Sequence, residues 1–164
     1  MSEATSAELT ALQAALAAEH AAVYGYGVVG GRLSADRRTE ALAAYTAHRA
    51  RRDALAREVR GLGAEPVAAS AGYALPFAVP DAAAAVRLAA ELEERVAGVY
   101  SDLVRASAHT RRKDAAAALR EAAVRAVRWR GGSVPFPGLA ERTGEDPASA
   151  GAAAGAEVSG TPTA

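Results

Sequence analysis

Apolar residues recur along the chain at the three- and four-residue spacing of amphipathic helices, and glycines and prolines divide this pattern into four segments. Each segment opens at a residue that can cap a helix and closes at or near a residue that ends one. We therefore expect four helices, from Ser6 to Gly30, from Ser34 to Gly61, from Asp81 to Ser107 and from Thr110 to Gly131.

The connections between these segments predict how the helices are arranged. The first and second helices, like the third and fourth, are joined by a few residues, so each pair should form an antiparallel hairpin. The middle segment 64–80 contains Pro66, Gly72, Pro76 and Pro80 and is not expected to be helical. Its roughly 18 residues could span about 60 Å, more than the roughly 40 Å of one helix. The third helix can therefore start parallel to the second, which is the arrangement of ferritin-like folds.

The sequence after Leu139 has no apolar periodicity and consists mostly of Ala, Gly, Ser, Thr, Pro and Glu. This composition is typical of a disordered segment. We expect one ferritin-like four-helix domain over residues 1–139 and a disordered tail over residues 140–164.

Composition supports an all-α fold and narrows the possible chemistry. The 164 residues include 47 alanines but only 2 Phe and 1 Trp, and alanine favours helices over strands. There is no Cys, which excludes disulfides and thiolate chemistry and leaves His, Asp and Glu as metal ligands. No secretory signal or stretch of about 20 apolar residues is present, so we expect a cytoplasmic protein with no membrane partner.

The predicted inward stripes of the helices carry several polar residues. On the first helix Glu19 and Tyr26 interrupt a stripe of larger apolar residues, and on the third helix Glu93 and Tyr100 repeat the same Glu-x6-Tyr spacing. The predicted stripes are Leu9, Leu12, Leu16, Glu19, Val23, Tyr26 and Gly30; Tyr45, His48, Arg52, Leu55, Val59 and Leu62; Val86, Ala89, Glu93, Val96, Tyr100 and Leu103; and Ala117, Arg120, Val124 and Val127.

Glu19, His48, Glu93 and Glu121 lie near the midpoints of their helices and are predicted to meet in one layer of the bundle. Buried carboxylates need a compensating charge, and carboxylates with an imidazole suit one iron or manganese ion. A di-iron site would need Glu-x-x-His on both the second and fourth helices. Here Tyr45 and Val124 replace one carboxylate and one imidazole, so two of six ligands are missing.

The alternative is a layer that is neutralised by the protein itself. In this interpretation, which we prefer, Arg52 and Arg120 pair with Glu19 and Glu93, while Tyr26, Tyr45 and Tyr100 donate hydrogen bonds. Two further histidines are not expected to be ligands. His20 points about 100° away from Glu19 around the helix and should contact a neighbouring segment, and His109 should be exposed in the turn before the fourth helix.

The chain resembles an actinobacterial ferritin-like family, domain of unknown function 4439, over about Leu9 to Leu139. The resemblance rests on Leu12, Gln13, Leu16, Glu19, His20 and Tyr24–Gly27; Ala47–Arg49 and Arg51–Asp53; Ala71–Tyr73 and Leu75–Phe77; Leu92–Glu94 and Tyr100; and Trp129 with Phe136–Leu139. It implies a ferritin-like bundle but no established activity. In the wider superfamily, which includes ferroxidases and oxygen-activating enzymes, the metal ligands correspond only to Glu19, His48, Glu93 and Glu121 of this chain.

The formal net charge is +0, but it is unevenly distributed. Eight Arg face four acids over 32–60, and eight basic residues face two acids over 105–130, whereas 81–104 carries five acids and two Arg. Complementary helix faces within the bundle explain this pattern, and an Arg-rich outer stripe could also bind an acidic protein. Overall neutrality argues against nucleic acid.

Two functional hypotheses follow from the sequence. The first is a non-catalytic helical protein, forming a homo-oligomer or binding a partner through its surface. The second is a metal-dependent redox or oxygen-handling protein that uses Glu19, His48, Glu93 and Glu121. The sequence singles out no catalytic residue for either hypothesis.

Overall fold

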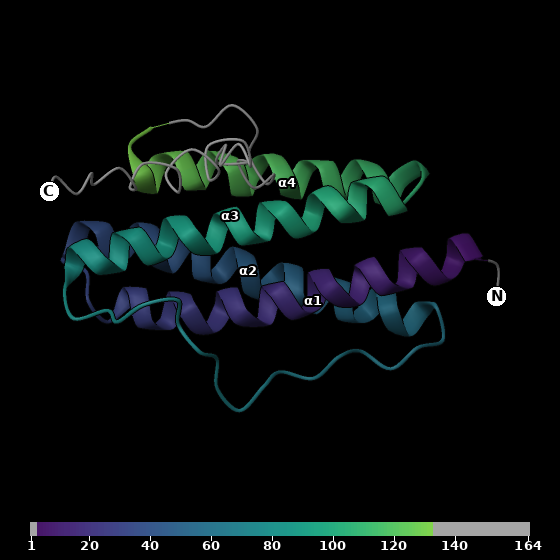
Figure 1. Cartoon of the computed structure of the whole chain (residues 1–164), viewed down its shortest axis with the longest axis horizontal. Coiled ribbons are helices and arrows are strands. Elements are labelled where there is room, and N and C mark those ends of the chain that lie inside the picture. Colours follow the sequence, from purple (N-terminus) through teal and green to yellow (C-terminus); the bar gives the residue numbers. More distant parts are fainter. Residues whose placement is uncertain (1–2, 133–164) are drawn as a thin grey trace, which may run out of the picture.

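The computed structural model describes residues 3–132 and contains the four predicted helices (Figure 1). They are α1 (Glu3–Gly30), α2 (Ala35–Gly61), α3 (Ala82–Ala106) and α4 (His109–Arg130). The described part of the chain has no strand, as expected for an all-α protein. The predicted end of the domain at 133–139 and the predicted tail at 140–164 lie outside the described residues.

The helix ends agree with the prediction to within a few residues, but the caps differ. The Asp81 carboxylate accepts a hydrogen bond from the Ala84 amide at 2.8 Å, as an N-cap of α3 should. Ser34 precedes α2, but its side chain makes no capping hydrogen bond. The prediction that Thr110 caps α4 is wrong, because the helix starts at His109 and Ala108 occupies the N-cap position, two residues earlier.

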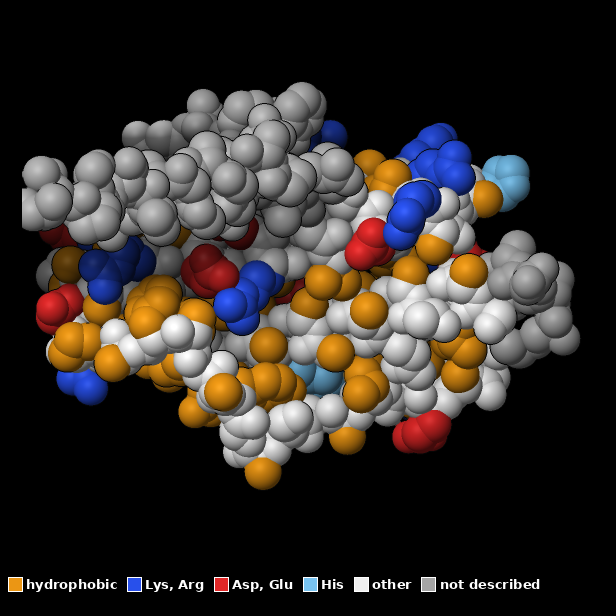
Figure 2. Space-filling view, in the orientation of Figure 1, with side chains coloured by type: hydrophobic (Ala, Val, Ile, Leu, Met, Phe, Trp, Pro, Cys, Tyr) orange, Lys and Arg blue, Asp and Glu red, His pale blue; other side chains and the backbone are white. Residues whose placement is uncertain are grey.

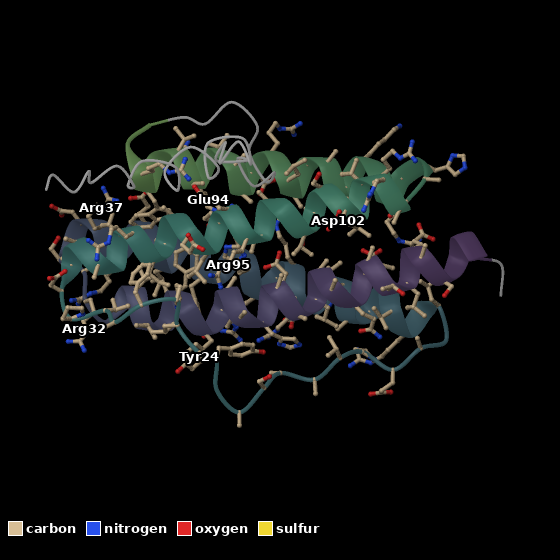
Figure 3. All side chains as sticks on the ribbon, in the orientation of Figure 1. Tyr24, Arg32, Arg37, Glu94, Arg95 and Asp102 are labelled. Atoms are coloured by element: carbon tan, nitrogen blue, oxygen red, sulfur yellow. The ribbon has the colours of Figure 1, made fainter. Side chains whose placement is uncertain are left out.

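The long connection between α2 and α3 crosses the bundle from one end to the other (Figure 1). It follows the outer side of α1, so α3 starts at the same end as α2 and runs parallel to it. Gln13 holds this crossover to α1, donating to the Glu65 carbonyl at 2.7 Å and accepting from the Val67 amide at 2.8 Å. Further along, Tyr24 points from α1 toward the crossover (Figure 3) and its ring lies 5.5 Å from that of Tyr73.

The core consists of two hydrophobic clusters separated by a polar layer. One cluster contains large residues of the first three helices, including Leu12, Leu16, Leu55, Val96 and Leu103. The other gathers at the opposite end around Tyr26, Val29, Leu33, Leu88 and Trp129. Glu19, His48 and Glu93 are buried polar residues that belong to neither cluster.

The prediction for α4 is wrong about which face points inward. Arg120 and Val124 are exposed, and the side of α4 that packs on the bundle is formed instead by small residues and one tryptophan. These buried residues are Ala115, Ala118, Ala122, Ala126 and Trp129. Alanine occurs on every side of this helix, so its positions carry no periodic signal in the sequence.

Hydrophobic side chains are plentiful along α1 and the crossover on the face shown in Figure 2. Charged contacts on α3 include Glu94, which points toward α4 (Figure 3) and pairs with Arg130. No helix within residues 3–132 combines the length and the apolar character needed to cross a membrane.

Candidate functional site

Three of the four predicted site residues meet at the centre of the bundle. Glu19 of α1, His48 of α2 and Glu93 of α3 are each 0% exposed. The two ring nitrogens of His48 contact different carboxylates, with Nδ1 2.6 Å from Glu19 Oε2 and Nε2 3.1 Å from Glu93 Oε1. His48 therefore bridges the two acids.

The two Glu-x6-Tyr sequences form a reciprocal pair. The Tyr100 hydroxyl donates to Glu19 Oε1 at 2.7 Å, and the Tyr26 hydroxyl donates to Glu93 Oε1 at 2.6 Å. Because α1 and α3 run antiparallel, equal spacing on both helices places each tyrosine opposite the glutamate of the other helix. The Tyr26 hydroxyl in turn accepts a hydrogen bond from Trp129 Nε1 at 2.8 Å, so the network reaches α4.

Glu121, the fourth predicted residue, does not enter the buried layer. Its side chain is 51% exposed and pairs with Arg51 of α2. It is linked to the layer through Arg125, whose Nη1 lies 3.7 Å from Glu121 and whose Nε donates to Glu93 Oε1 at 2.6 Å. Arg125 is thus the guanidinium that neutralises Glu93.

The structure corrects the sequence analysis on which residues provide the counter-charge. Arg52 pairs with Asp53 next to it, not with the buried acids, and Arg120 is exposed. Tyr45 is not among the hydrogen-bond donors to Glu19 or Glu93, whereas Tyr26 and Tyr100 are, as predicted.

A sequence signal for the arginine that was missed does exist. Arg125 follows Arg51 by the same number of residues as Glu93 follows Glu19 and Tyr100 follows Tyr26. The Arg51 guanidinium lies 5.9 Å from the Tyr100 ring but pairs with Glu121, whereas Arg125 contacts the buried Glu93. His48 breaks this repeat, because Ala122 occupies the corresponding position on α4.

The two other histidines lie outside the layer, as expected. His20 Nε2 is 3.2 Å from the Val67 carbonyl of the crossover. His109 is exposed at the start of α4.

The buried acids are paired with basic side chains of the protein itself. Burial alone would lower the pKa of the His48 imidazole, but its hydrogen bonds to Glu19 and Glu93 and their charges outweigh burial and raise that pKa. Burial alone would raise the pKa of Glu93, but His48 and Arg125 outweigh it and lower that pKa. The surroundings therefore favour the protonated form of His48 and the ionised form of Glu93.

The tyrosines remain protonated donors in this layer. Burial, followed by the charge of Glu93, raises the pKa of Tyr26, and burial, followed by the charge of Glu19, raises the pKa of Tyr100. A phenol whose pKa is raised keeps its proton and therefore continues to donate a hydrogen bond to the neighbouring carboxylate.

The helical arrangement and the long crossover define a ferritin-like four-helix protein. In agreement, the chain is similar in structure to a ferritin-like, diiron-carboxylate protein from Bacillus anthracis str. Ames, with a TM-score of 0.58 and 13% identity over 80% of this chain and 93% of that one. This low identity supports the shared fold alone.

The chain belongs to the family described as Domain of unknown function (DUF4439), whose model matches residues 11–141. It is also similar to a conserved hypothetical protein, rv2844, from Mycobacterium tuberculosis. The two share 38% sequence identity and a TM-score of 0.75, over 77% of this chain and 96% of that one. Among curated proteins, none matches the chain by sequence.

The structural neighbour from Bacillus anthracis str. Ames is described as a diiron-carboxylate protein, but the buried layer of this chain does not fit two metal ions. The layer offers two carboxylates and one imidazole, and both imidazole nitrogens already contact carboxylates. Glu93 Oε1 is also occupied, because it accepts hydrogen bonds from Tyr26 and Arg125 and contacts His48 Nε2. Within residues 3–132, no group of three or more His, Asp or Glu side chains is arranged to hold a metal ion.

Proposed function

We propose that the protein is a non-catalytic ferritin-like bundle that acts through contacts of its surface with other copies or with a partner protein. The observation that carries this proposal is the bridging contact of His48 with both Glu19 and Glu93. An imidazolium that donates from both nitrogens has no lone pair left for a metal ion. The place where ferritin-like proteins can hold metal is here used for a hydrogen-bonded charge network.

Metal analysis of protein purified from cells supplied with iron and manganese tests this proposal. We expect less than about a tenth of an equivalent of either metal in the wild type. About one equivalent that is lost in Glu19→Ala but kept in Glu91→Ala would overturn it. Glu91 is a suitable control because it is a carboxylate on α3 that pairs with Arg95 at the surface.

The competing hypothesis is a single iron or manganese ion held by Glu19, His48 and Glu93, with Glu121 as a further ligand. One observation favours it, since Glu93 Oε2 is buried and has no hydrogen-bond partner among the described residues. Carboxylate oxygens with an imidazole are suitable ligands for these ions. Binding would require His48 to lose a proton, so metal uptake under this hypothesis would release protons and weaken at low pH.

The outer side of α4 supports the proposal of an acidic partner. Lys113, Arg120 and Arg128 are exposed and form no ion pair with any described residue. Val124 is 45% exposed between the two arginines, which adds an apolar contact.

Homo-oligomer formation is the other proposed mode of action, and light scattering of the purified protein distinguishes an oligomer from a monomer. A cytoplasmic location stays a prediction.

A further inference from the structure

The side of the bundle between α2 and α4 is built differently from the other three sides. α1 packs closely on α2 and on α3, and α3 packs closely on α4, but α2 and α4 are not among the closely packed pairs. Ion pairs join them instead. Arg51 of α2 pairs with Glu121 of α4, and Arg111 of α4 donates to Glu58 of α2 at 3.0 Å.

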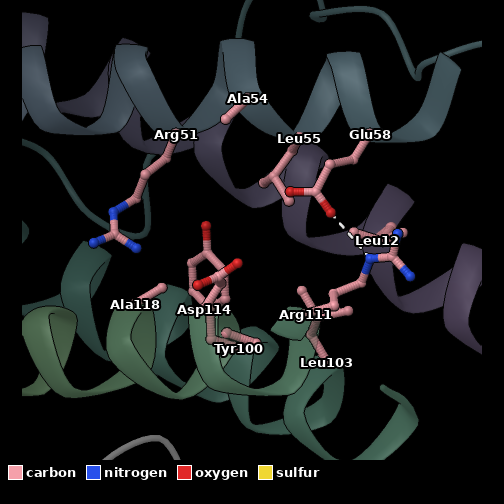
Figure 4. Close-up of a pocket in the computed structure, with 11 residues that line it drawn as sticks. Leu12, Arg51, Ala54, Leu55, Glu58, Tyr100, Leu103, Arg111, Asp114 and Ala118 are labelled. Atoms are coloured by element: carbon pink, nitrogen blue, oxygen red, sulfur yellow. Dashed lines mark hydrogen bonds and ion pairs between the residues drawn. The ribbon is translucent and has the colours of Figure 1, made fainter. Parts of the chain in front are cut away.

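A cavity of about 110 Å³ opens between these two ion pairs (Figure 4). Its apolar lining comes from all four helices and consists of Leu12, Ala54, Leu55, Leu103, Ala115 and Ala118 together with the Tyr100 ring. An apolar cavity of about 150 Å³ can hold benzene, so this volume suits a hydrocarbon of about four carbon atoms.

The charged groups at the cavity favour a cation over an anion. Arg51 is already paired with Glu121, and Arg111 is shared by Glu8 at 2.8 Å and Glu58 at 3.0 Å. An anionic ligand would have to displace one of these carboxylates. Asp114 also lines the cavity, rising from α4 beside Tyr100 (Figure 4), and forms no ion pair with any described residue.

We propose that this cavity binds a small organic cation, a primary alkylammonium whose hydrocarbon part lies on the leucines and whose ammonium group pairs with Asp114. The apolar lining supplies most of the contact, and the carboxylate at the rim selects the charge. The site is separate from the surfaces in the proposed function, and of its lining residues Tyr100 also belongs to the His48 network.

Titrations with n-butylammonium, 1-butanol and pentanoate test the proposal, with the methyl NMR signals of Leu12, Leu55 and Leu103 as the readout. Each probe carries a four-carbon alkyl chain, and the three differ in charge. We expect n-butylammonium to bind about tenfold more tightly than pentanoate, which is the size of effect that one exposed carboxylate gives between opposite ligand charges. Equal or tighter binding of pentanoate, or no shift of these methyl signals with n-butylammonium, would overturn the proposal.

Three variants locate the site. Asp114→Asn should reduce the preference for the cation to about threefold or less, whereas Asp102→Asn, a control at an exposed carboxylate of α3, should keep it. Ala54→Leu places a larger side chain in the cavity from a half-buried position on α2 and should abolish the methyl shifts while the protein still melts cooperatively. A preference that Asp114→Asn leaves unchanged, or methyl shifts that persist in Ala54→Leu, would show that the ligand binds elsewhere.

Discussion

Replacing His48 by glutamine should destabilise the bundle strongly, because it removes the basic side chain that contacts both Glu19 and Glu93. His48 contacts Glu19 at 2.6 Å and Glu93 at 3.1 Å, and all three side chains are 0% exposed. Glutamine carries no charge, so Glu93 would keep only Arg125 in contact and Glu19 would lose its contact with a basic side chain. Removing one partner of a buried ion pair costs about 3–5 kcal/mol. For a domain of this size, that corresponds to a fall of about 10–20 °C in Tm.

Urea unfolding of the wild type and four variants measures this effect and assigns its cause. The variants are His48→Gln, Glu19→Gln, the double variant of these two and His109→Gln. His109→Gln is the matched control, since this histidine is exposed, and it should change the free energy of unfolding by less than about 0.5 kcal/mol. In the double variant His48→Gln/Glu19→Gln the charges balance again, so it should be more stable than the sum of the single effects by at least about 1.5 kcal/mol. A loss below about 1 kcal/mol for His48→Gln, or strictly additive effects, would show that His48 does not neutralise the buried acids.

Three further predictions concern the same network and the helix ends. The contribution of His48 to the free energy of unfolding should be complete below its ordinary pKa of 6.5 and should be lost as the pH rises through its raised pKa. The contribution of Glu93 should be complete above its ordinary pKa of 4.5 and should be lost as the pH falls through its lowered pKa. Urea titrations across pH check this, and an alkaline decline that is unchanged in His48→Gln would contradict it. Tyr100→Phe should lower the free energy of unfolding by about 1.5–3 kcal/mol, because Glu19 loses a hydrogen bond. Tyr26→Phe should lower it more, because Trp129 Nε1 also loses its hydrogen-bond partner. A larger loss for Tyr100→Phe than for Tyr26→Phe would count against the network. Asp81→Ala should lower the unfolding free energy by about 1 kcal/mol, while Ser34→Ala, whose side chain makes no capping bond, should have little effect. Equal losses in thermal melts would show that the carboxylate of Asp81 does not act as a cap.

The sequence was most informative on α1 and α3, where large residues stand out against alanine. Leu12, Leu16 and Glu19 mark the buried side of α1, and Glu93 and Tyr100 mark that of α3. The long proline-containing connection was equally informative, because its length allowed it to cross the bundle. These features predicted the fold and three of the residues that meet at its centre.

The sequence was least informative on α4. This helix packs mainly through alanine, so the valines and Arg120 suggested a stripe that the structure places at the surface. The error shifted the expected counter-charge from Arg125 to Arg120 and drew Glu121 into the layer. An arginine side chain is long enough to reach a buried carboxylate from the edge of a helix face, so periodicity alone does not identify it.

The most direct test of the account is the protonation state of His48, measured by ¹⁵N NMR of the imidazole nitrogens at neutral pH. The charge network predicts that both nitrogens carry protons, and that added Zn²⁺, a diamagnetic ion that binds histidine, leaves their signals unchanged. A deprotonated nitrogen that shifts when about one equivalent of Zn²⁺ is added would contradict the account and support a metal site.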